Sequence, residues 1–442
     1  MEWKDLLLSD RLGRGASTSA EVRSQYQRDF DRIVFSTAFR RLQDKTQVFP
    51  LAESDYVRTR LTHSIEVSSV GRSLGTLIGG MVREHEQSNG VAPQEFGNIV
   101  AAACLAHDIG NPPFGHSGEQ AIRAWFESRG CAFLETLTPA ETQDLLKFEG
   151  NAQGFRVLTR LQNSQNAGGL QLTYAVLGAY TKYPKQSVVP GMEKSKKVSE
   201  KKFGIYQAEL PHFREIADKL GLLPKRNDAW VRHPLTFLVE AADDICYRVI
   251  DFEDGCRLGR VSFSEAEPLL RPIAFPKAEK EATNSYDSIE DTKGKIEYLR
   301  ARAINTLIYG AADTFRDNYE RIMRGEFEDD LISHSPFLPQ LRKIKEQSVS
   351  QVYATPSVVH IEAAGFEVLG GLLGRIVPAL VGDEGTRTAQ DDKVRQLIPP
   401  QFRAGNTKYE KLLAATDFVS GMTDSFAVTL YRRLSGIELP SG

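Results

Sequence analysis

The sequence predicts a mostly α-helical protein. Apolar residues recur at helical spacing in several segments, strand-like alternation is scarce, and turn residues such as Gly110, Pro112 and Pro113 end a run of helix formers. The chain has 442 residues, enough for two domains or one large domain with a buried core.

The elements follow in order along the chain. Residues 1–20 are expected to be irregular, because they end in a stretch rich in Gly, Ser and Thr at 13–19. Helices are then expected around 67–81, 99–106, 121–126, 238–252, 304–315 and 366–377. The apolar stripe of the segment 67–81 consists of Val67, Val70, Leu74, Leu77 and Met81. That of 121–126 consists of Ala121, Ile122, Trp125 and Phe126, and that of 238–252 consists of Leu238, Ala242, Ile245, Val249 and Phe252.

Two polar stretches interrupt this pattern. The stretch 277–295 suggests a boundary between a front region, 1–276, with a core at about 40–254, and a C-terminal region, 277–442. The stretch 185–202 carries six lysines with Pro190 and Gly191, so we expect a mobile surface loop. An alternative role is contact with an allosteric deoxynucleotide or single-stranded nucleic acid, although lysines without interleaved aromatic residues bind single strands poorly.

Composition excludes some classes of protein. The apolar fraction is 41%, the charged fraction 26% and the formal net charge −3, so no global field attracts nucleic acid or a membrane. We expect no transmembrane helix and no signal peptide. The four cysteines are scattered without a CxxC pair, which is typical of reduced thiols in a cytoplasmic protein.

The segment LAHDIGNPPFGHSGE carries the first group of chemically active residues. His107 and Asp108 lie where a helix ends, and imidazole with carboxylate suits a divalent metal of intermediate softness. The alternative is a purely structural role, in which this pair provides a helix cap and a charge on the surface. Across the Pro-Pro-Phe-Gly turn, His116 and Glu119 fit a proton-transfer pair, while Ser117 alternatively caps the next helix.

His63 and Arg60 lie one turn apart in the segment RTRLTHSIEV. His63 shares the predicted buried face with Val67 and Val70, where a lone histidine is more often a hydrogen-bonded core residue than a ligand. The neighbouring arginine favours a site, because a buried histidine beside a cation needs an anion or carboxylate.

A third group lies in the segment EAADDICYRVIDFED. Asp243, Tyr247 and Asp251 follow at i, i+4 and i+8, on the face opposite the apolar stripe. The usual meaning of such a face is exposure to solvent. Tyr247 is poorly suited to full exposure, so a face that contacts a sugar and a metal is the alternative.

Taken in order, His63, His107-Asp108 and Asp243 resemble the H…HD…D pattern of HD-domain phosphohydrolases. The longer strings RRLQDKTQVFPL, VRTRLTHSIEV, HDIGNPPFGHSGE, FEGNAQG and EAADDICY are similar to those of bacterial deoxyguanosine triphosphate triphosphohydrolases. The similarity runs from about Arg40 to Asp254 and continues more weakly to the end, as in SGMTDSFA. It implies an HD-type helical core with an additional C-terminal helical region that contributes to the substrate site and to assembly.

The resemblance also implies roles for residues. The metal ligands would be His63, His107, Asp108 and Asp243, holding Mg²⁺ or Mn²⁺, with Fe²⁺, Ni²⁺ or Co²⁺ also compatible. The catalytic pair would be His116 and Glu119, with Glu149 as a further active-site polar residue; alternatively, Glu149 and Asn151 have a helix-capping or hydrogen-bonding role. The substrate-binding residues would be Arg60, Lys182, Tyr183, Tyr247, Asp251 and Gln43: Arg60 and Lys182 for phosphate, Tyr247 and Asp251 for deoxyribose, and Gln43 for the 3′-hydroxyl.

The implied reaction is metal-dependent hydrolysis of dGTP, or of several dNTPs, to deoxynucleoside and inorganic triphosphate by attack of water at the α-phosphorus. Relatives commonly form homo-oligomers, often hexamers. Two other functions stay open at this point: an HD-type 5′-nucleotidase or phosphodiesterase, and a non-enzymatic sensor of nucleotide or nucleic acid. A monophosphate site would not need Arg60, Lys182 and Tyr247 together, and a sensor would not need a proton-transfer pair.

Overall fold

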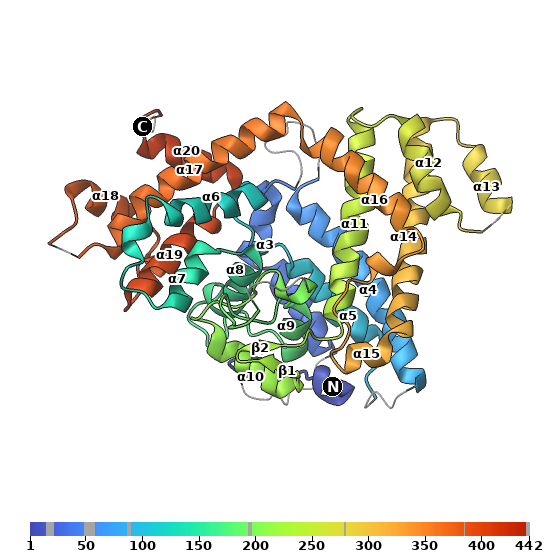
Figure 1. Ribbon diagram of the computed structural model, residues 1–442, viewed down its shortest axis with the longest axis horizontal. Helices are drawn as coiled ribbons and strands as arrows, with labels where there is room; N and C mark the ends of the chain where they lie inside the picture. Colours follow the sequence, from blue (N-terminus) through green and yellow to red (C-terminus); the bar gives the residue numbers. More distant parts are fainter. Residues whose placement is uncertain are drawn as a thin grey trace.

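A computed structural model describes residues 1–14, 22–47, 58–85, 90–192, 197–277, 280–383 and 385–438. As the sequence predicts, the fold is mostly helical, with twenty α-helices in the described ranges (Figure 1). Within those ranges the one sheet is a short antiparallel pair, β1 (Pro224–Arg226) with β2 (Ala229–Trp230).

The helices alternate with short 3-10 and π-helical segments. The front region contains α1 (Trp3–Leu6), α2 (Gln25–Val34), α3 (Thr37–Arg41), η1 (Leu42–Asp44), α4 (Arg60–His85), α5 (Pro93–Ala106), α6 (Gly115–Glu127), η2 (Cys131–Phe133), α7 (Pro139–Leu146), α8 (Gly150–Arg156), η3 (Val157–Leu161), α9 (Tyr174–Tyr180), η4 (Val198–Glu200), α10 (Leu210–Leu220), α11 (Thr236–Arg257) and α12 (Phe263–Ala274). The remainder contains α13 (Lys280–Asp287), α14 (Thr292–Asp317), α15 (Tyr319–Met323), η5 (Ile332–His334), α16 (Leu338–Gln347), η6 (Ser348–Tyr353), α17 (Pro356–Val381), α18 (Ala389–Leu397), η7 (Pro400–Phe402), α19 (Lys408–Ser420) and α20 (Asp424–Leu434). Of the seven η segments, η3 and η6 are π-helical.

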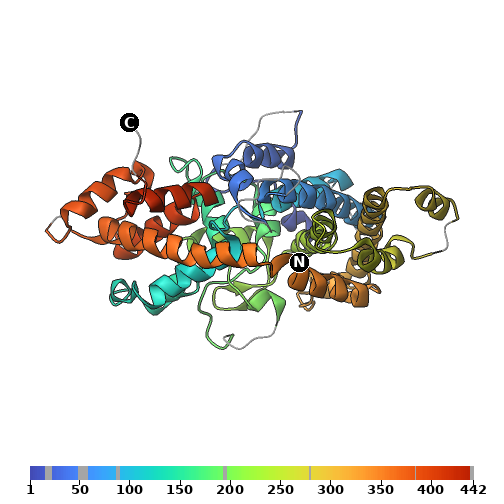
Figure 2. The same cartoon turned by 90° about the horizontal axis from the view of Figure 1, so that it is seen from above.

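The molecule is elongated, and its two ends come from different parts of the chain. In both views, α18 and α20 lie at one end and α12 and α13 at the other (Figures 1 and 2). Helices α4, α5 and α11 lie between them and contact one another.

Helices α4 and α5 pack closely because α4 carries glycines every four residues. A Cβ added at Gly71 would lie 2.4 Å from Sγ of Cys104, and one at Gly75 would lie 2.6 Å from the carbonyl oxygen of Phe96. Both neighbours belong to α5. Val67, one turn from Gly71, is fully buried, which confirms the predicted stripe on α4.

Helix α11 brings the core and the site together. Its predicted apolar residues are all fully buried, and they pack toward α4, α5 and α14. The other face is not the solvated acidic surface that its composition alone suggests, because Asp251 is only 1% exposed. The helix therefore presents polar side chains to the interior.

Two large clusters of buried hydrophobic residues stabilise the fold, and a third contains Val189, Met192 and Ala229. The larger contains residues of α4, α5, α11, α12 and α14, and the other forms around α6, α17 and α19. Each of the two large clusters draws residues from both sides of position 276. The division at that position stays a prediction from the sequence.

The N-terminal residues are more ordered than expected. Within 1–14, α1 forms and Trp3, Leu6 and Leu12 are buried. The amino group of Met1 donates to the carbonyl oxygen of Met323 at 2.8 Å, and Trp3 Nε1 donates to the hydroxyl of Tyr319 at 2.7 Å. The prediction of an irregular segment is therefore wrong for 3–6, while residues 15–20 lie outside the described residues.

The segment 185–202 is also packed where it is described. Lys185, Val189, Met192 and Ser199 are buried, and Lys202 forms an ion pair with Glu149. The expectation of a mobile surface loop is wrong for these residues, because long-range contacts hold them. Lys194 and Lys196 lie outside the described residues.

Helix α17 is the one helix in the described ranges that is long and apolar enough to span a membrane. Its segment Val358–Val381 has a hydropathy of 1.5, and 56% of the apolar window is buried in the fold. The expectation of no transmembrane helix stays a prediction, because length and composition alone single out this helix. Helix α17 packs against α6, α18, α19 and α20, which is the arrangement of a core helix.

Candidate metal centre and active site

Three predicted metal ligands come together from three helices. His63 lies in the first turn of α4, His107 caps the C-terminus of α5, and Asp243 lies on α11. One ligand atom from each residue lies within 4.8 Å of the others. The Nε2 atom of His63 is 3.1 Å from Oδ1 of Asp243, and Nε2 of His107 is 3.6 Å from the same oxygen.

The His107 ring is oriented by the backbone. Its Nδ1 lies 2.7 Å from the carbonyl oxygen of Cys104, so Nδ1 carries the proton and donates. The lone pair on Nε2 then faces Asp243 and His63. This is the usual way in which a metal-binding histidine is held in the required tautomer.

Asp108 borders the cluster and is held by two donors. Its Oδ2 accepts from Arg60 NH1 at 2.7 Å and its Oδ1 accepts from Asn111 Nδ2 at 2.5 Å, while Nε2 of His107 lies 3.6 Å from Oδ1. Burial opposes ionisation of Asp108, but Arg60 and the neighbouring histidines lower its pKa below the usual range. The fourth predicted ligand is thus an ionised carboxylate next to the other three.

The electrostatics of the cluster are those of a cation site. Burial lowers the pKa of His63, but the hydrogen bond and charge of Asp243 and the charge of Asp108 outweigh it and bring the pKa to about 9. The two histidines and Lys182 conversely lower the pKa of Asp243, against the effect of burial. Two imidazoles and two carboxylates fit a divalent transition metal or Mg²⁺. When no metal is bound, the two carboxylates favour a protonated His63, whose positive charge balances theirs.

The turn between α5 and α6 positions the second pair. Phe114 adopts a left-handed conformation with φ of 62°, and its N–H donates to Oδ1 of Asp424 at 3.1 Å. Helix α6 begins at Gly115, with Phe114 as its N-cap residue. The prediction that Ser117 caps this helix was wrong, because Ser117 lies inside its first turn.

His116 and Glu119 form the predicted pair. Nδ1 of His116 lies 2.9 Å from Oε2 of Glu119, and the His116 side chain is 63% exposed while that of Glu119 is 4% exposed. Oε1 of Glu119 accepts the N–H of Gly150 at 2.7 Å. Burial raises the pKa of Glu119, but the hydrogen bond from His116 and the charge of Lys202 outweigh it, so this carboxylate stays ionised.

Arg60 connects the two groups. Its NH1 donates to Asp108, and a Cβ on Gly115, the neighbour of His116, would lie 2.6 Å from its NH2. The guanidinium thus lies against the backbone at Gly115, whose φ of 57° favours glycine. One arginine therefore contacts Asp108 beside the cluster and lies next to Gly115, which precedes His116 in the chain.

The predicted sugar-binding face of α11 is completed by a residue from the C-terminal region. The Tyr247 ring stacks on Tyr353, with centroids 5.8 Å apart and planes at 13°. The Tyr353 hydroxyl donates to Oδ2 of Asp251 at 2.9 Å, and Oδ1 of Asp251 is buried without a partner among the described residues. Burial raises the pKa of Asp251 to about 6.

The remaining predicted residues differ in how they are placed. Lys182 forms an ion pair with Glu240 on α11 at 3.1 Å, and its charge reaches Asp243. Tyr183 is buried, and Lys182 Nζ lies 5.8 Å from its ring centroid. Gln43 is exposed on η1, and no hydrogen bond connects it to the cluster in the described ranges.

Comparison with known proteins gives two family matches and several full-length relatives. Residues 60–142 match the HD domain and residues 333–433 match the phosphohydrolase-associated domain. The chain is 43% identical over 449 residues to a deoxyguanosinetriphosphate triphosphohydrolase-like protein of Synechocystis sp., covering 99% of this chain and 100% of the relative. It is 40% identical over 458 residues to a protein of the same description from Pseudomonas aeruginosa, with both chains covered fully. A deoxyguanosinetriphosphate triphosphohydrolase of Salmonella typhimurium is 31% identical over 501 residues, with 97% of both chains covered.

The chain belongs to the deoxyguanosinetriphosphate triphosphohydrolase family of HD-domain proteins. As a member of this family it is an HD phosphohydrolase, and the His63–His107–Asp243 cluster fits the metal that HD domains use. The HD match includes His63, His107, Asp108 and the His116–Glu119 pair, while Asp243 lies beyond it on α11.

Three residues of this family member, Lys202, Arg123 and Tyr353, were not indicated as site residues by the sequence. Lys202 lies 2.7 Å from Oε1 of Glu149 and 4.0 Å from Oε2 of Glu119. Arg123 NH2 bridges the same two carboxylates at 3.2 and 3.5 Å. Glu149 is the N-cap residue of α8, and its side chain makes no capping hydrogen bond but accepts from Asn151 Nδ2 at 3.1 Å, so the hydrogen-bonding form of the structural alternative is confirmed.

The third such residue is Tyr353. It lies in the π-helical segment η6, about 100 residues after Asp251 in the chain. No local pattern in the sequence connects the two. An aromatic residue just before a Pro at the start of α17 was the sole available signal.

Proposed function

We propose that this chain hydrolyses dGTP to deoxyguanosine and inorganic triphosphate at the site formed by α4, α5, α6 and α11. The observation that supports this most is the pairing of two groups across Arg60: a His-His-Asp cluster bordered by ionised Asp108, and an exposed imidazole hydrogen-bonded to a buried carboxylate. The names of the relatives point to the same substrate.

In the proposed reaction, water attacks the α-phosphorus and the bond from phosphorus to the 5′-oxygen breaks. His63, His107, Asp108 and Asp243 would hold a divalent metal, with Mg²⁺ or Mn²⁺ proposed, which supplies Lewis acidity toward the α-phosphate and the attacking water.

His116 is proposed as the proton carrier. Because its Nδ1–H donates to Glu119, its Nε2 is the nitrogen that would give a proton to the departing 5′-oxygen, or alternatively act on the in-line nucleophile. Glu119 orients the ring and stabilises its charged form. Arg123 and Lys202 keep Glu119 ionised by charge.

The substrate would extend along α11. Arg60 and Lys182 are proposed to bind the triphosphate, with Tyr183 beside Lys182. Tyr247, held by its stack on Tyr353, would pack against C2′ and exclude a 2′-hydroxyl. The partnerless Oδ1 of Asp251 would accept the 3′-hydroxyl, and Gln43 is retained as a second residue for that hydroxyl.

Product analysis tests the proposal. The purified chain is incubated with Mn²⁺ or Mg²⁺ and each dNTP, singly and mixed, or with dGMP, and the products are separated by ion-exchange chromatography, with a chelator-treated sample as control. Deoxyguanosine and triphosphate from dGTP alone are expected. Turnover of monophosphates alone would replace the proposal by a 5′-nucleotidase, and no turnover by metal-loaded protein would leave a nucleotide sensor. A homo-oligomer stays a prediction that sedimentation of the same sample checks.

A further inference from the structure

The turn that precedes His116 is held by a residue of the C-terminal region. Asp424 is the first residue of α20, and its side chain accepts hydrogen bonds from residues 310 and 378 positions earlier in the chain. Its Oδ1 accepts the N–H of Phe114 at 3.1 Å. Its Oδ2 accepts the N–H of Thr46 at 3.0 Å and also the hydroxyl of Thr46. One carboxylate therefore joins α20 to two separate segments of the front region.

A local role does not account for Asp424. The dipole of a helix favours a carboxylate in its first turn, but such a residue is commonly exposed to solvent. Asp424 is 1% exposed, and Thr423 is the N-cap residue of α20, whose side-chain oxygen accepts the N–H of Phe426 at 3.3 Å. Because a carboxylate withdrawn from water is costly unless donors satisfy it, the long-range donors account for this burial.

Phe114 needs the support, because its backbone is strained. Its φ of 62° lies in the left-handed region, which residues other than glycine rarely adopt. As the N-cap residue of α6, it has no acceptor for its N–H within that helix. Its ring packs on α17, where a Cβ added at Gly365 would lie 3.0 Å from the ring. Both supports belong to the range 333–433 that matches the phosphohydrolase-associated domain.

The residues just before Asp424 hold the other end of the same loop. Lys45 Nζ donates to the carbonyl oxygen of Ser420 at 2.8 Å and to that of Asn111 at 2.5 Å. Asn111 in turn donates from its side chain to Asp108. The C-terminal region is thus connected both to the start of this loop, beside the metal cluster, and to its end, beside His116.

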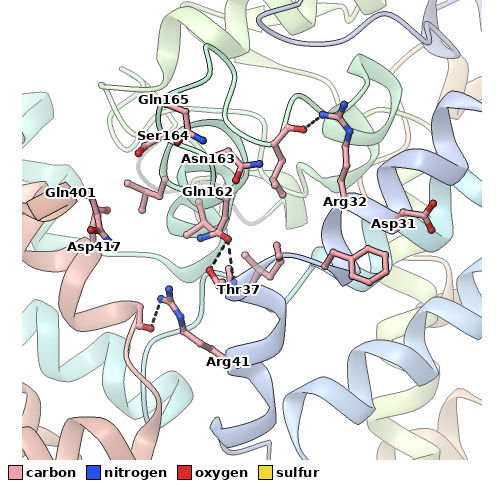
Figure 3. A pocket seen from close by; sticks show the side chains of 18 of the residues that line it. Asp31, Arg32, Thr37, Arg41, Gln162, Asn163, Ser164, Gln165, Gln401 and Asp417 are labelled. Atoms are coloured by element: carbon pink, nitrogen blue, oxygen red, sulfur yellow. Dashed lines mark hydrogen bonds between the residues drawn. The ribbon is translucent and has the colours of Figure 1, made fainter. Parts of the chain in front are cut away.

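A third contact fixes the C-terminal segment itself. Arg41, the last residue of α3, donates from NH1 to the carbonyl oxygen of Gly421 at 2.8 Å. Figure 3 shows this bond beside a pocket that Arg41 lines. The segment 420–424 is therefore attached to α3 as well as to the loop, which gives the carboxylate of Asp424 a fixed position.

The position of Phe114 matters because His116 follows two residues later, in the first turn of α6. The His116 side chain is 63% exposed, so packing restrains it little and its hydrogen bond to Glu119 orients the ring. Where the ring lies then depends on where α6 begins, which the backbone of Phe114 sets. A displacement of about 1 Å of a catalytic group can lower the rate about 100-fold.

We propose that Asp424 is a positioning residue for His116: by binding the N–H of Phe114 it fixes the start of α6 and thereby the direction of the imidazole. The inference rests on the proposed role of His116 as the proton carrier. It gives the C-terminal region a part in the reaction that acts through the backbone and needs no contact with the substrate.

Hydrogen–deuterium exchange of the full chain tests the contact without any turnover. Asp424→Asn keeps the size of the side chain but places an amide donor against one of the two N–H groups. The peptide that spans 112–119 should exchange about tenfold faster in this variant. Ser425→Ala is the matched control, because exposed Ser425 donates to Asp44 and not to the turn. Unchanged exchange of this peptide in Asp424→Asn would refute the proposal, whether or not the chain hydrolyses dGTP.

A double-mutant cycle on dGTP hydrolysis tests whether Asp424 acts through His116. Asp424→Asn should lower kcat about 10–100-fold and leave KM and metal content unchanged. In the His116→Ala background the same change should alter kcat less than about twofold, because the group that it positions is absent. Gly365→Ala crowds the Phe114 ring from α17 and should behave likewise, so it replaces Asp424→Asn if that variant does not fold.

Effects of Asp424→Asn and His116→Ala that multiply would overturn the proposal, because Asp424 would then act on the fold and not through His116. The absence of dGTP turnover in the unsubstituted chain would contradict the proposed function instead. The exchange measurement would then still decide whether Asp424 fixes the start of α6.

Discussion

At the scale of single residues, the site depends on a few hydrogen bonds that fix which atom faces the reaction. The bond from His107 to the carbonyl of Cys104 directs Nε2 toward Asp243, and the bond from His116 to Glu119 leaves Nε2 as the nitrogen proposed to meet the substrate. Buried Glu119 is held in turn by the N–H of Gly150. These bonds orient rings that would otherwise rotate freely.

The first prediction concerns metal content. His63→Ala and Asp108→Ala should each lose the bound metal and all turnover, because each removes one donor from the four proposed ligands: His63 of the His63–His107–Asp243 cluster, or Asp108 beside it. Metal is measured by mass spectrometry after equilibration with Mn²⁺ and dialysis. The control is His334→Ala, since His334 is exposed on η5. Stoichiometric metal with normal turnover in either test variant would show that the ligand assignment is wrong.

The second prediction concerns proton transfer. His116→Ala should retain metal and substrate affinity but lower kcat about 10²–10⁴-fold, the usual contribution of a general acid or base. Glu119→Gln should lower kcat less, since it keeps the size of the side chain but removes the charge that stabilises the imidazolium. Steady-state kinetics with dGTP measure both. An unchanged kcat in His116→Ala would eliminate this residue as the proton carrier.

At the scale of elements, α8 closely approaches the turn that follows His107 and Asp108. This contact holds the metal cluster and the His116–Glu119 pair together. A Cβ added at Gly110 would lie 2.1 Å from the carbonyl oxygen of Gly150 and from the nitrogen of Gly154. Both are backbone atoms, so no side chain can move aside to make room. The same N-terminal turn of α8 binds Glu119 through Gly150.

The third prediction follows from that contact. Gly110→Ala should lower the free energy of unfolding by about 1–3 kcal/mol, the usual cost of overpacking. Gly80→Ala is the matched control, because Gly80 lies inside α4 with nothing within 4 Å of an added Cβ, and this change should stabilise by up to about 1 kcal/mol. Urea denaturation measures both. Equal stability of the two variants would contradict the account of this packing.

The sequence predicted helices well where one stripe of apolar residues is buried, as on α4 and α11. It failed for 185–202, because the lysine-rich composition does not reveal the ion pair of Lys202 with Glu149, 53 residues earlier. It predicted the residues of the cluster, since the motif strings carry them. It did not indicate Tyr353, whose contact with Asp251 depends on how η6 folds back on α11.

At the scale of the whole molecule, polar contacts join segments from the two ends of the chain. Asp144 on α7 is buried and accepts the hydroxyl of Tyr409 on α19 at 2.5 Å and the N–H of Gln207 at 2.7 Å. Burial raises its pKa from 3.8 to about 7, against the effect of these hydrogen bonds. The folded state therefore favours the protonated carboxyl.

The fourth prediction gives the sign of the pH dependence. Because the pKa of Asp144 is higher in the folded state than in the unfolded state, the protonated carboxyl contributes fully to the free energy of unfolding below about pH 4. This contribution is lost as the pH rises to about 7. Relative to Asp144→Asn, the unsubstituted chain should lose up to about 1.4 kcal/mol per pH unit between pH 5 and 7, and nothing further above about pH 8. Exposed Asp317→Asn is the control. Parallel stability curves for the chain and Asp144→Asn would contradict this sign.

The central claim is that water attacks the α-phosphorus at the metal centre, and labelling with ¹⁸O tests this claim most directly. The chain hydrolyses dGTP in H₂¹⁸O with Mn²⁺, and mass spectrometry follows the label in both products. We predict one ¹⁸O in the inorganic triphosphate and none in the deoxyguanosine. Label in the 5′-hydroxyl of deoxyguanosine, or dGMP and pyrophosphate as products, would contradict the account.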